Sequence, residues 1–159
     1  MLKVEPVPVP QYPLRQSQHS EAEKNTFRIA CLGPSLSGKT QLAIFLTLKV
    51  YKNCWSAIHL WSPNAWKDAT FAPLRKHMKE DLGLDLDEYL HTNFSDSELA
   101  EAMAKSGAVA DYTKEHFGAK GPNFSSLHLF DDSSTDSNLR HSRNFQNLFT
   151  MGRHDFCSV

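Results

Sequence analysis

The stretch from Gly33 to Thr40 carries the clearest chemistry in this chain, and it reads Gly-Pro-Ser-Leu-Ser-Gly-Lys-Thr. The pattern GxxxxGK[ST] is that of a loop that binds phosphate groups through its backbone N–H groups. Glycine at Gly33 and Gly38 allows a tight turn and a close approach to phosphate oxygens. Lys39 would place a positive charge at the β- and γ-phosphates, and Thr40 would offer its hydroxyl to Mg²⁺.

We therefore expect ATP and Mg²⁺ as ligands of this loop, at the amino end of a helix whose dipole favours anions. The alternative is a glycine-rich turn that binds no phosphate. The candidate nucleotide contacts are Gly33, Pro34, Ser35, Leu36, Ser37, Gly38, Lys39, Thr40 and Gln41.

Two adjacent acids, Asp131 and Asp132, follow the mostly apolar run 127–130. Beside a phosphate loop, the first acid would hold Mg²⁺, usually through water. The second would orient and deprotonate an attacking water, which fits nucleotide hydrolysis better than phosphorylation of a small molecule. A solvated turn is the plain alternative, because Asp and Ser are common after strands.

The elements that must position these residues alternate between strands and helices, which indicates an α/β fold with a mostly parallel sheet. A buried strand should precede the loop, and a helix that is apolar nearly all round should follow it. Ser95 and Glu98 have the spacing of a helix-capping box. The expected strands are 27–32, 55–61, 126–130 and 155–159, and the expected helices are 39–52, 74–82, 96–117 and 138–149.

Residues 1–24 are predicted to form a flexible tail before a single domain at 25–159. Four of the eight prolines fall in this tail, and alternating proline favours an extended polyproline II conformation. The spacing of Pro10 and Pro13 leaves a partner-docking role open, although a plain linker is the simpler interpretation.

The composition excludes several classes of protein. With 40% hydrophobic residues and a net charge of -1, the chain is an ordinary globular protein with no overall electrostatic sign of nucleic-acid binding. Three cysteines without a CxxC pair argue against zinc and redox sites and fit a reducing compartment; Cys31 and Cys157 are expected to be buried. We find no signal peptide and no membrane span, which favours a cytoplasmic protein that is not secreted.

A basic cluster in the middle of the chain is a candidate DNA contact, with Trp66 and Phe71 nearby. A solvated helix face is the more ordinary interpretation, because Glu80 and Asp81 follow at once. The cluster consists of Lys67, Arg75, Lys76, His77 and Lys79.

The segment 148–159 completes a recognisable order of motifs, with a helix that ends in Gly152-Arg153-His154 and a strand after it. With the phosphate loop and the paired acids, this order resembles the genome-packaging ATPases of large DNA viruses, the poxvirus type within the FtsK/HerA superfamily of P-loop NTPases. The resemblance covers about 27–159. Many families share the phosphate loop, so the Arg153-His154 segment separates this family from other P-loop proteins better than the loop does.

The resemblance implies a three-layer P-loop sandwich and an ATPase motor that pumps double-stranded DNA into a capsid. It implies a homo-oligomeric ring, capsid or other packaging proteins as partners, and a location in the host cytoplasm or the virion. Mg²⁺ would lie at Thr40 and Asp131, and the catalytic residues would be Lys39, Asp132 and Arg153. The family often has glutamate where this chain has Asp132, so the shorter acid would have to sit closer.

Arg153 would serve as an arginine finger across the ring interface; an ion pair or a helix cap is the structural alternative. Arg140 and Arg143 are weaker finger candidates. In the family, the strand after Arg-His usually leads to a polar sensor residue, commonly Gln, and then to further sheet. Here the chain stops at Val159, so we expect an incomplete core, as in a truncated gene, a fragment or a split protein.

Two other functions stay open. One is a P-loop kinase acting on a small substrate, which would want an arginine-rich lid that the sequence does not obviously contain. The other is a protein that binds nucleotide without turning it over.

Overall fold

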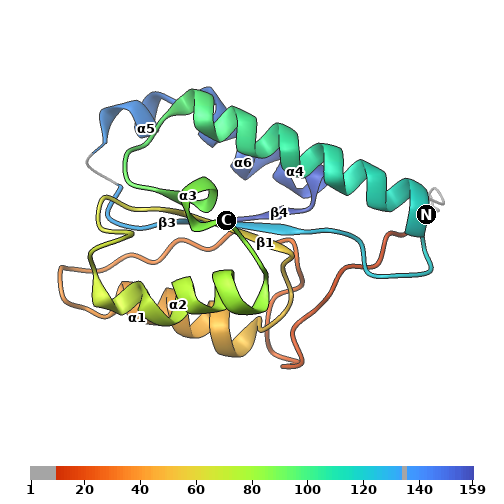
Figure 1. The fold of residues 1–159 in the computed structure, drawn as a ribbon, viewed down its shortest axis with the longest axis horizontal. Coiled ribbons are helices and arrows are strands. Elements are labelled where there is room, and N and C mark those ends of the chain that lie inside the picture. The colour runs from red at the N-terminus through yellow and green to blue at the C-terminus, as the bar shows by residue number, and fades with distance from the viewer. Residues whose placement is uncertain (1–9, 134–135) are drawn as a thin grey trace, which may run out of the picture.

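The computed structural model describes residues 10–133 and 136–159 and has an α/β architecture around a parallel sheet (Figure 1). Its strands are β1 (Ala57–Trp61), β2 (Leu90–His91), β3 (Ser126–Phe130) and β4 (Cys157–Ser158). They run in the order β2-β1-β3-β4, and every pair is parallel. The predicted α/β class and parallel sheet are confirmed.

Helices cover both faces of this sheet, as Figure 1 shows. One face carries α1 (Lys39–Phe45) and α2 (Ala72–Lys76); the other carries α4 (Asp96–Phe117), α5 (Ser137–His141) and α6 (Arg143–Met151). The short helix α3 (Leu86–Tyr89) leads into β2. None of the helices in the described part of the chain is long and apolar enough to cross a membrane.

The expected strand at 27–32 is not a regular strand. Phe27 and Ile29 exchange backbone hydrogen bonds with Val159, from the Ile29 N–H at 2.9 Å and the Val159 N–H at 3.1 Å. Beyond Ile29 the pairing stops, and Leu32 is 93% exposed as the backbone turns into the loop. The extended segment 27–29 thus continues the sheet beyond β4, so that β4 lies between this segment and β3.

The helix after the loop is found close to its expected bounds, with one side packed and the other exposed. Helix α1 passes directly into the π-helical turn η1 (Leu46–Val50). Ile44 is buried against the sheet, whereas Leu42 and Phe45 remain 48% and 54% exposed. The helix therefore packs against the sheet as predicted, but the described chain covers only one side of it and leaves the apolar residues on the other side exposed.

The other elements follow the expected pattern with local breaks. The expected helix 74–82 is α2 with the π-helical turn η3 (His77–Asp81), after a 3₁₀ turn η2 (Ala69–Phe71). The expected helix 138–149 is divided into α5 and α6, because Ser142 is extended and its hydroxyl caps α6 by accepting from the Phe145 N–H. The 3₁₀ turn η4 (Gly152–Asp155) delays the last strand, which was expected from 155.

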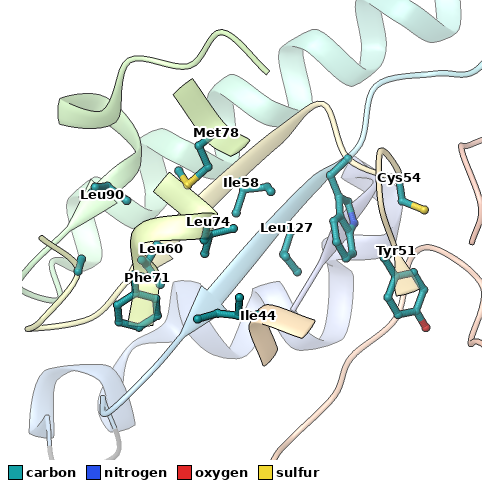
Figure 2. Packing of buried hydrophobic residues seen from close by; sticks show 12 residues of the cluster. Ile44, Tyr51, Cys54, Ile58, Leu60, Phe71, Leu74, Met78, Leu90 and Leu127 are labelled. Carbon is teal, nitrogen blue, oxygen red and sulfur yellow. The ribbon is translucent and has the colours of Figure 1, made fainter. Parts of the chain in front are cut away.

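The two faces of the sheet have different chemistry because side chains alternate along β1. Ile58 and Leu60 point into an apolar core under α1 and α2, together with Leu74, Met78 and Leu127 (Figure 2). His59 and Trp61 point to the other face, where α4 and α6 pack. The α4 face therefore holds aromatic and polar groups where a purely aliphatic core is more usual.

Residues 10–24 have no helix or strand and lie against the domain. Asn123 donates from its backbone and its side chain to the Pro13 carbonyl, at 2.8 and 3.2 Å. Farther along, the Ser17 hydroxyl donates to the Val50 carbonyl. The prolines at 6 and 8 of the expected tail lie outside the described residues. Among the cysteines, Cys54 and Cys157 are buried, but Cys31 is only half-buried, contrary to expectation.

Candidate functional site

The phosphate-loop sequence forms a tight turn whose shape depends on its glycines. Gly38 has φ of 84°, a left-handed conformation that strains other residues, and it directly precedes α1. A Cβ added to Gly33 would lie 2.7 Å from the Ser37 hydroxyl. Both fixed glycines of the pattern thus have a steric reason here. The loop is exposed along 33–38, and within it the Ser37 N–H donates to the Pro34 carbonyl at 3.3 Å.

The Lys39 side chain folds back over this loop. Its ammonium group donates to the Gly33 carbonyl at 3.1 Å and to the Pro34 carbonyl at 2.8 Å. These contacts hold the positive charge above the turn, where it adds to the field of the loop N–H groups and the helix terminus. The predicted residues 33–40 are therefore contiguous in space, with the Lys39 charge over the turn. Gln41 is exposed on the first turn of α1.

Thr40 and Asp131 are brought together by the fold. Thr40 is on the first turn of α1, and Asp131 directly follows β3. The Thr40 hydroxyl donates to Oδ1 of Asp131 at 2.9 Å. Asp131 is held in place because its own N–H donates to the Trp61 carbonyl at the end of β1. The two oxygens predicted to hold Mg²⁺ are thus neighbours at the carboxyl edge of the sheet, the edge where the parallel strands end.

The Asp131 carboxyl has a raised pKa. Burial is the main cause, and the negative charges of Asp132 and Asp68 add to it; the Thr40 hydrogen bond and the Lys39 charge oppose the shift. A half-buried carboxylate beside other carboxylates is stabilised when a cation binds. Asp68 was missed by the sequence analysis. In the structure, the Asp68 side chain caps the turn η2 by accepting from the Thr70 N–H, which is a local role that gives no sign of a nearby site.

Asp132 faces a different region from Asp131. Its φ of 53° is unusual for a residue other than glycine and turns the backbone sharply after Asp131. It lines a cavity of about 190 Å³ that also includes Ser62, Thr92 and Asn93, residues that follow β1 and β2. In this conformation no hydrogen bond joins the Asp132 side chain to a described residue of the phosphate loop.

The predicted arginine finger is far from its own site. Arg153 lies in η4, which precedes β4, and β4 begins opposite Ser126, the first residue of β3. Arg153 is therefore at the amino edge of the sheet, whereas the phosphate loop leads into Thr40, which meets Asp131 at the carboxyl edge. Arg140 and Arg143 are exposed. Their helices follow the loop that leaves the carboxyl end of β3, which is the edge of the sheet where the phosphate loop lies.

Most of the basic cluster makes contacts within the chain. Arg75 donates to the carbonyls of Ala65 at 2.6 Å and Asp68 at 3.1 Å. Lys76 pairs with Glu80, and buried His77 bonds Asp81 at 2.7 Å. Lys67 and Lys79 are exposed, as is Lys76, so the DNA contact expected of this cluster stays a prediction.

No protein family model, curated protein or solved structure matches this chain. The chemistry of the site consequently rests on its own geometry. Over the residues that the structure describes, no three His, Cys, Asp or Glu side chains converge closely enough to hold a metal ion by themselves. Thr40 and Asp131 nevertheless suit Mg²⁺, which binds oxygen and usually takes one or two protein ligands together with water and substrate phosphates.

Proposed function

We propose that this protein binds a nucleoside triphosphate, ATP, with Mg²⁺ at the phosphate loop and hydrolyses it. The observation that carries the proposal is the 2.9 Å contact between Thr40 and Asp131. A glycine-rich turn with no phosphate-binding role gives no reason for a hydroxyl and a half-buried carboxylate to meet beside it. A Mg²⁺–triphosphate site requires that meeting.

Each residue has a defined task in this proposal. The loop N–H groups bind the phosphate oxygens, and Lys39 turns from the Gly33 and Pro34 carbonyls to the β- and γ-phosphates. Thr40 and Asp131 hold Mg²⁺, which supplies charge neutralisation on the phosphates when bound. Asp132 must rotate out of its cavity to orient an attacking water, so we assign hydrolysis to a rearranged state of the loop after β3.

We further propose that hydrolysis drives movement along double-stranded DNA, as in the viral packaging ATPases that the order of motifs resembles. The order of phosphate loop, paired acids and Gly-Arg-His segment supports this. The edge on which Arg153 lies also fits a role toward a neighbouring subunit in a ring better than a role at its own site. The fold assignment as a P-loop NTPase sandwich belongs to the same proposal.

A nucleotide-binding protein without turnover is the second candidate. It is favoured by the placement of Asp132 in a separate cavity. This placement leaves the binding residues together while separating the proposed catalytic acid from them.

The test compares ATP binding and phosphate release for the unmodified protein and Lys39→Ala, with and without double-stranded DNA. We expect Lys39→Ala to abolish tight ATP binding, and DNA to stimulate turnover by the unmodified protein. Unchanged affinity in Lys39→Ala would refute the phosphate-loop assignment. Lys49→Ala, an exposed lysine farther along the same helical segment, is the matched control and should bind ATP normally.

Three other outcomes separate the alternatives. Tight binding without turnover, with or without DNA, would favour the non-hydrolysing protein. ATP turnover that double-stranded DNA does not stimulate would support the ATPase proposal and contradict the proposal of a DNA motor. Phosphate transfer to a nucleoside instead of water would favour a kinase.

A further inference from the structure

Three imidazole rings lie side by side on the α4 face of the sheet. His91 is on β2, His59 on β1 and His128 on β3. His59 and His128 are register partners whose ring centroids are 4.7 Å apart and whose planes differ by 8°. Trp61 and His91 are also register partners, with centroids 3.7 Å apart. The strands therefore hold these rings in fixed positions.

A chain of hydrogen bonds joins two of these rings to a carboxylate. Nδ1 of His91 lies 3.3 Å from Oε2 of Glu98, and an ionised carboxylate only accepts, so Nδ1 of His91 carries the proton. Nε2 of His91 then has a lone pair and accepts from Nδ1 of His59 at 3.2 Å. Because Nδ1 of His59 donates, Nε2 of the neutral ring is an acceptor. Glu98 at one end of the chain thus determines the character of His59 at the other.

Nε2 of His59 is the free end of this chain. The His59 side chain belongs to a residue that is only 5% exposed, and no described residue bonds this nitrogen. Burial is the main cause that lowers the pKa of His59, to about 3, and burial also lowers the pKa of His91. Both rings are therefore neutral at pH 7. A buried acceptor without a donor is costly, so a donor brought from outside the chain would stabilise it.

His59 and His91 line a cavity of about 350 Å³ between β2, α3 and the first half of α4. The cavity also contains four carboxylates and one lysine, whose ammonium group is paired with Glu88 at 2.5 Å. These residues are exposed and form its rim; they are Asp87, Glu88, Glu98, Glu101 and Lys105. A guest would therefore meet a negative rim and, at His59, a buried acceptor. Both features call for a cation that can donate hydrogen bonds.

We propose that this cavity binds a small alkylamine, of the di- or polyamine class. One ammonium group donates to Nε2 of His59, and a second lies among the rim carboxylates. Glu98 is a positioning residue as well, because it fixes the tautomers of both rings. The hydrogen-bonded chain stays intact in this arrangement.

Other cations fit the cavity less well. A metal ion needs several converging ligands, and no three His, Cys, Asp or Glu side chains converge in the part of the chain that the structure describes. A quaternary ammonium ion has the charge but no N–H to offer His59. An ammonium group has three donors and needs only acceptors around it. This site is independent of the nucleotide proposed at the phosphate loop, since α1 lies on the other face of the sheet.

The experiment titrates the full-length protein by calorimetry with putrescine and with spermidine, at physiological salt and with Mg²⁺ in excess. We expect saturable binding of one amine per chain. The fully N-methylated, bis-quaternary analogue of putrescine has the same charges without N–H groups. It should bind at least tenfold more weakly.

Variants then locate the site. His59→Phe keeps an aromatic ring in the stack and removes the acceptor, so it should weaken binding by about 10–150-fold. Glu101→Gln removes one exposed rim charge and should weaken binding by roughly two- to fivefold. Glu115→Gln makes the same change on an exposed part of α4 outside the cavity and should have no effect. Asp131→Asn should also have none.

The comparison of putrescine with its methylated analogue uses the unmodified protein, so it decides the matter even if His59→Phe fails to fold. The proposal is overturned if neither amine binds saturably, or if the methylated analogue binds as tightly as putrescine. Equal weakening by Glu115→Gln and Glu101→Gln would show attraction to the acidic surface in general and would also overturn it. So would loss of binding in Asp131→Asn, which would place the amine near the phosphate loop.

Discussion

The Thr40 hydroxyl donates a 2.9 Å hydrogen bond to the Asp131 carboxylate across 91 positions of sequence. Neither residue could reach the other through local structure. The contact exists because the phosphate loop and the end of β3 both lie at the carboxyl edge of the same parallel sheet. In α/β folds, ligands bind at that edge. Two separate sequence patterns therefore meet at one place in the fold.

Asp131→Asn should test the metal half of this site. The amide has the same shape and can still accept from Thr40, so the fold should persist while the negative charge is lost. Loss of a charged contact of this kind is worth about 1.5–3 kcal/mol, or roughly 10–150-fold in the affinity for MgATP. Fluorescence titration with a labelled nucleotide, with and without Mg²⁺, measures it. Equal Mg²⁺ dependence in the variant and the unmodified protein would exclude Asp131 as a ligand.

The matched control is Asp132→Asn, one residue along. Because Asp132 lines a neighbouring cavity, its variant should bind MgATP normally and lose only turnover.

Gly33→Ala should weaken nucleotide binding for a steric reason. The new methyl group would lie 2.7 Å from the Ser37 hydroxyl, so the Ser37 side chain would have to leave its position in the loop. We expect at least a tenfold loss of ATP affinity with little change in thermal stability, because the loop is exposed. The double variant Gly33→Ala/Ser37→Ala removes the clash and should recover much of the affinity. A double variant as weak as the single one would mean that the Ser37 contact is not the cause.

The sequence predicts best where a local signal ends an element. The bounds 96–117 of α4 are as expected, because Ser95 caps one end and Gly118 follows the other. Strand β3 is also as expected, because an apolar run stops at two acids. The close approach of Thr40 and Asp131 follows from the parallel sheet alone, once both patterns are placed at the ends of its strands.

The rest depends on tertiary packing. Strand β2 has only two residues, Leu90 and His91, too few to show a period. Asp68 reaches the site from a turn, which no motif indicates. The sequence shows that Leu42 and Phe45 lie on an apolar helix, but it does not show whether another element of the fold covers them. The sequence also placed Asp132 after a strand without revealing that a left-handed backbone would turn it away from the loop.

Asn25→Ala should destabilise the domain. The buried Asn25 amide donates to the Ser125 hydroxyl at 3.1 Å and the Cys54 carbonyl at 3.4 Å, and it accepts from the Ser158 hydroxyl at 2.7 Å. Truncation removes these three hydrogen bonds and leaves the buried Ser158 hydroxyl proton without its acceptor, and an unsatisfied buried group of this kind costs about 1–3 kcal/mol. We expect a loss of about 2–4 kcal/mol in the free energy of unfolding, measured with urea. Asn147→Ala, on an exposed face of α6, is the control; an equal loss there would contradict the role of Asn25.

The stacked histidines should make the protein sensitive to mild acid. Burial, followed by the charge of neighbouring imidazoles, lowers the pKa of His59 to about 3 and that of His128 well below its usual value. An unfolded histidine has a pKa of about 6.5, so the unfolded chain binds more protons below that pH. The stability that these neutral rings contribute is therefore complete above about pH 6.5 and is lost as the pH falls toward 3.

Each of these two rings should lower the free energy of unfolding by up to about 1.4 kcal/mol per pH unit once the pH is well below 6.5. Urea unfolding between pH 7.5 and 5.0, in buffer with a chelator, measures the slope while most carboxylates stay ionised. His128→Phe keeps an aromatic ring in the stack and removes one titrating group, so its slope should be shallower. His116→Gln changes an exposed ring and should keep the full slope. Equal stability at pH 7.5 and 5.0 in the unmodified protein would show that the rings are protonated without penalty, which burial on three adjacent strands does not allow.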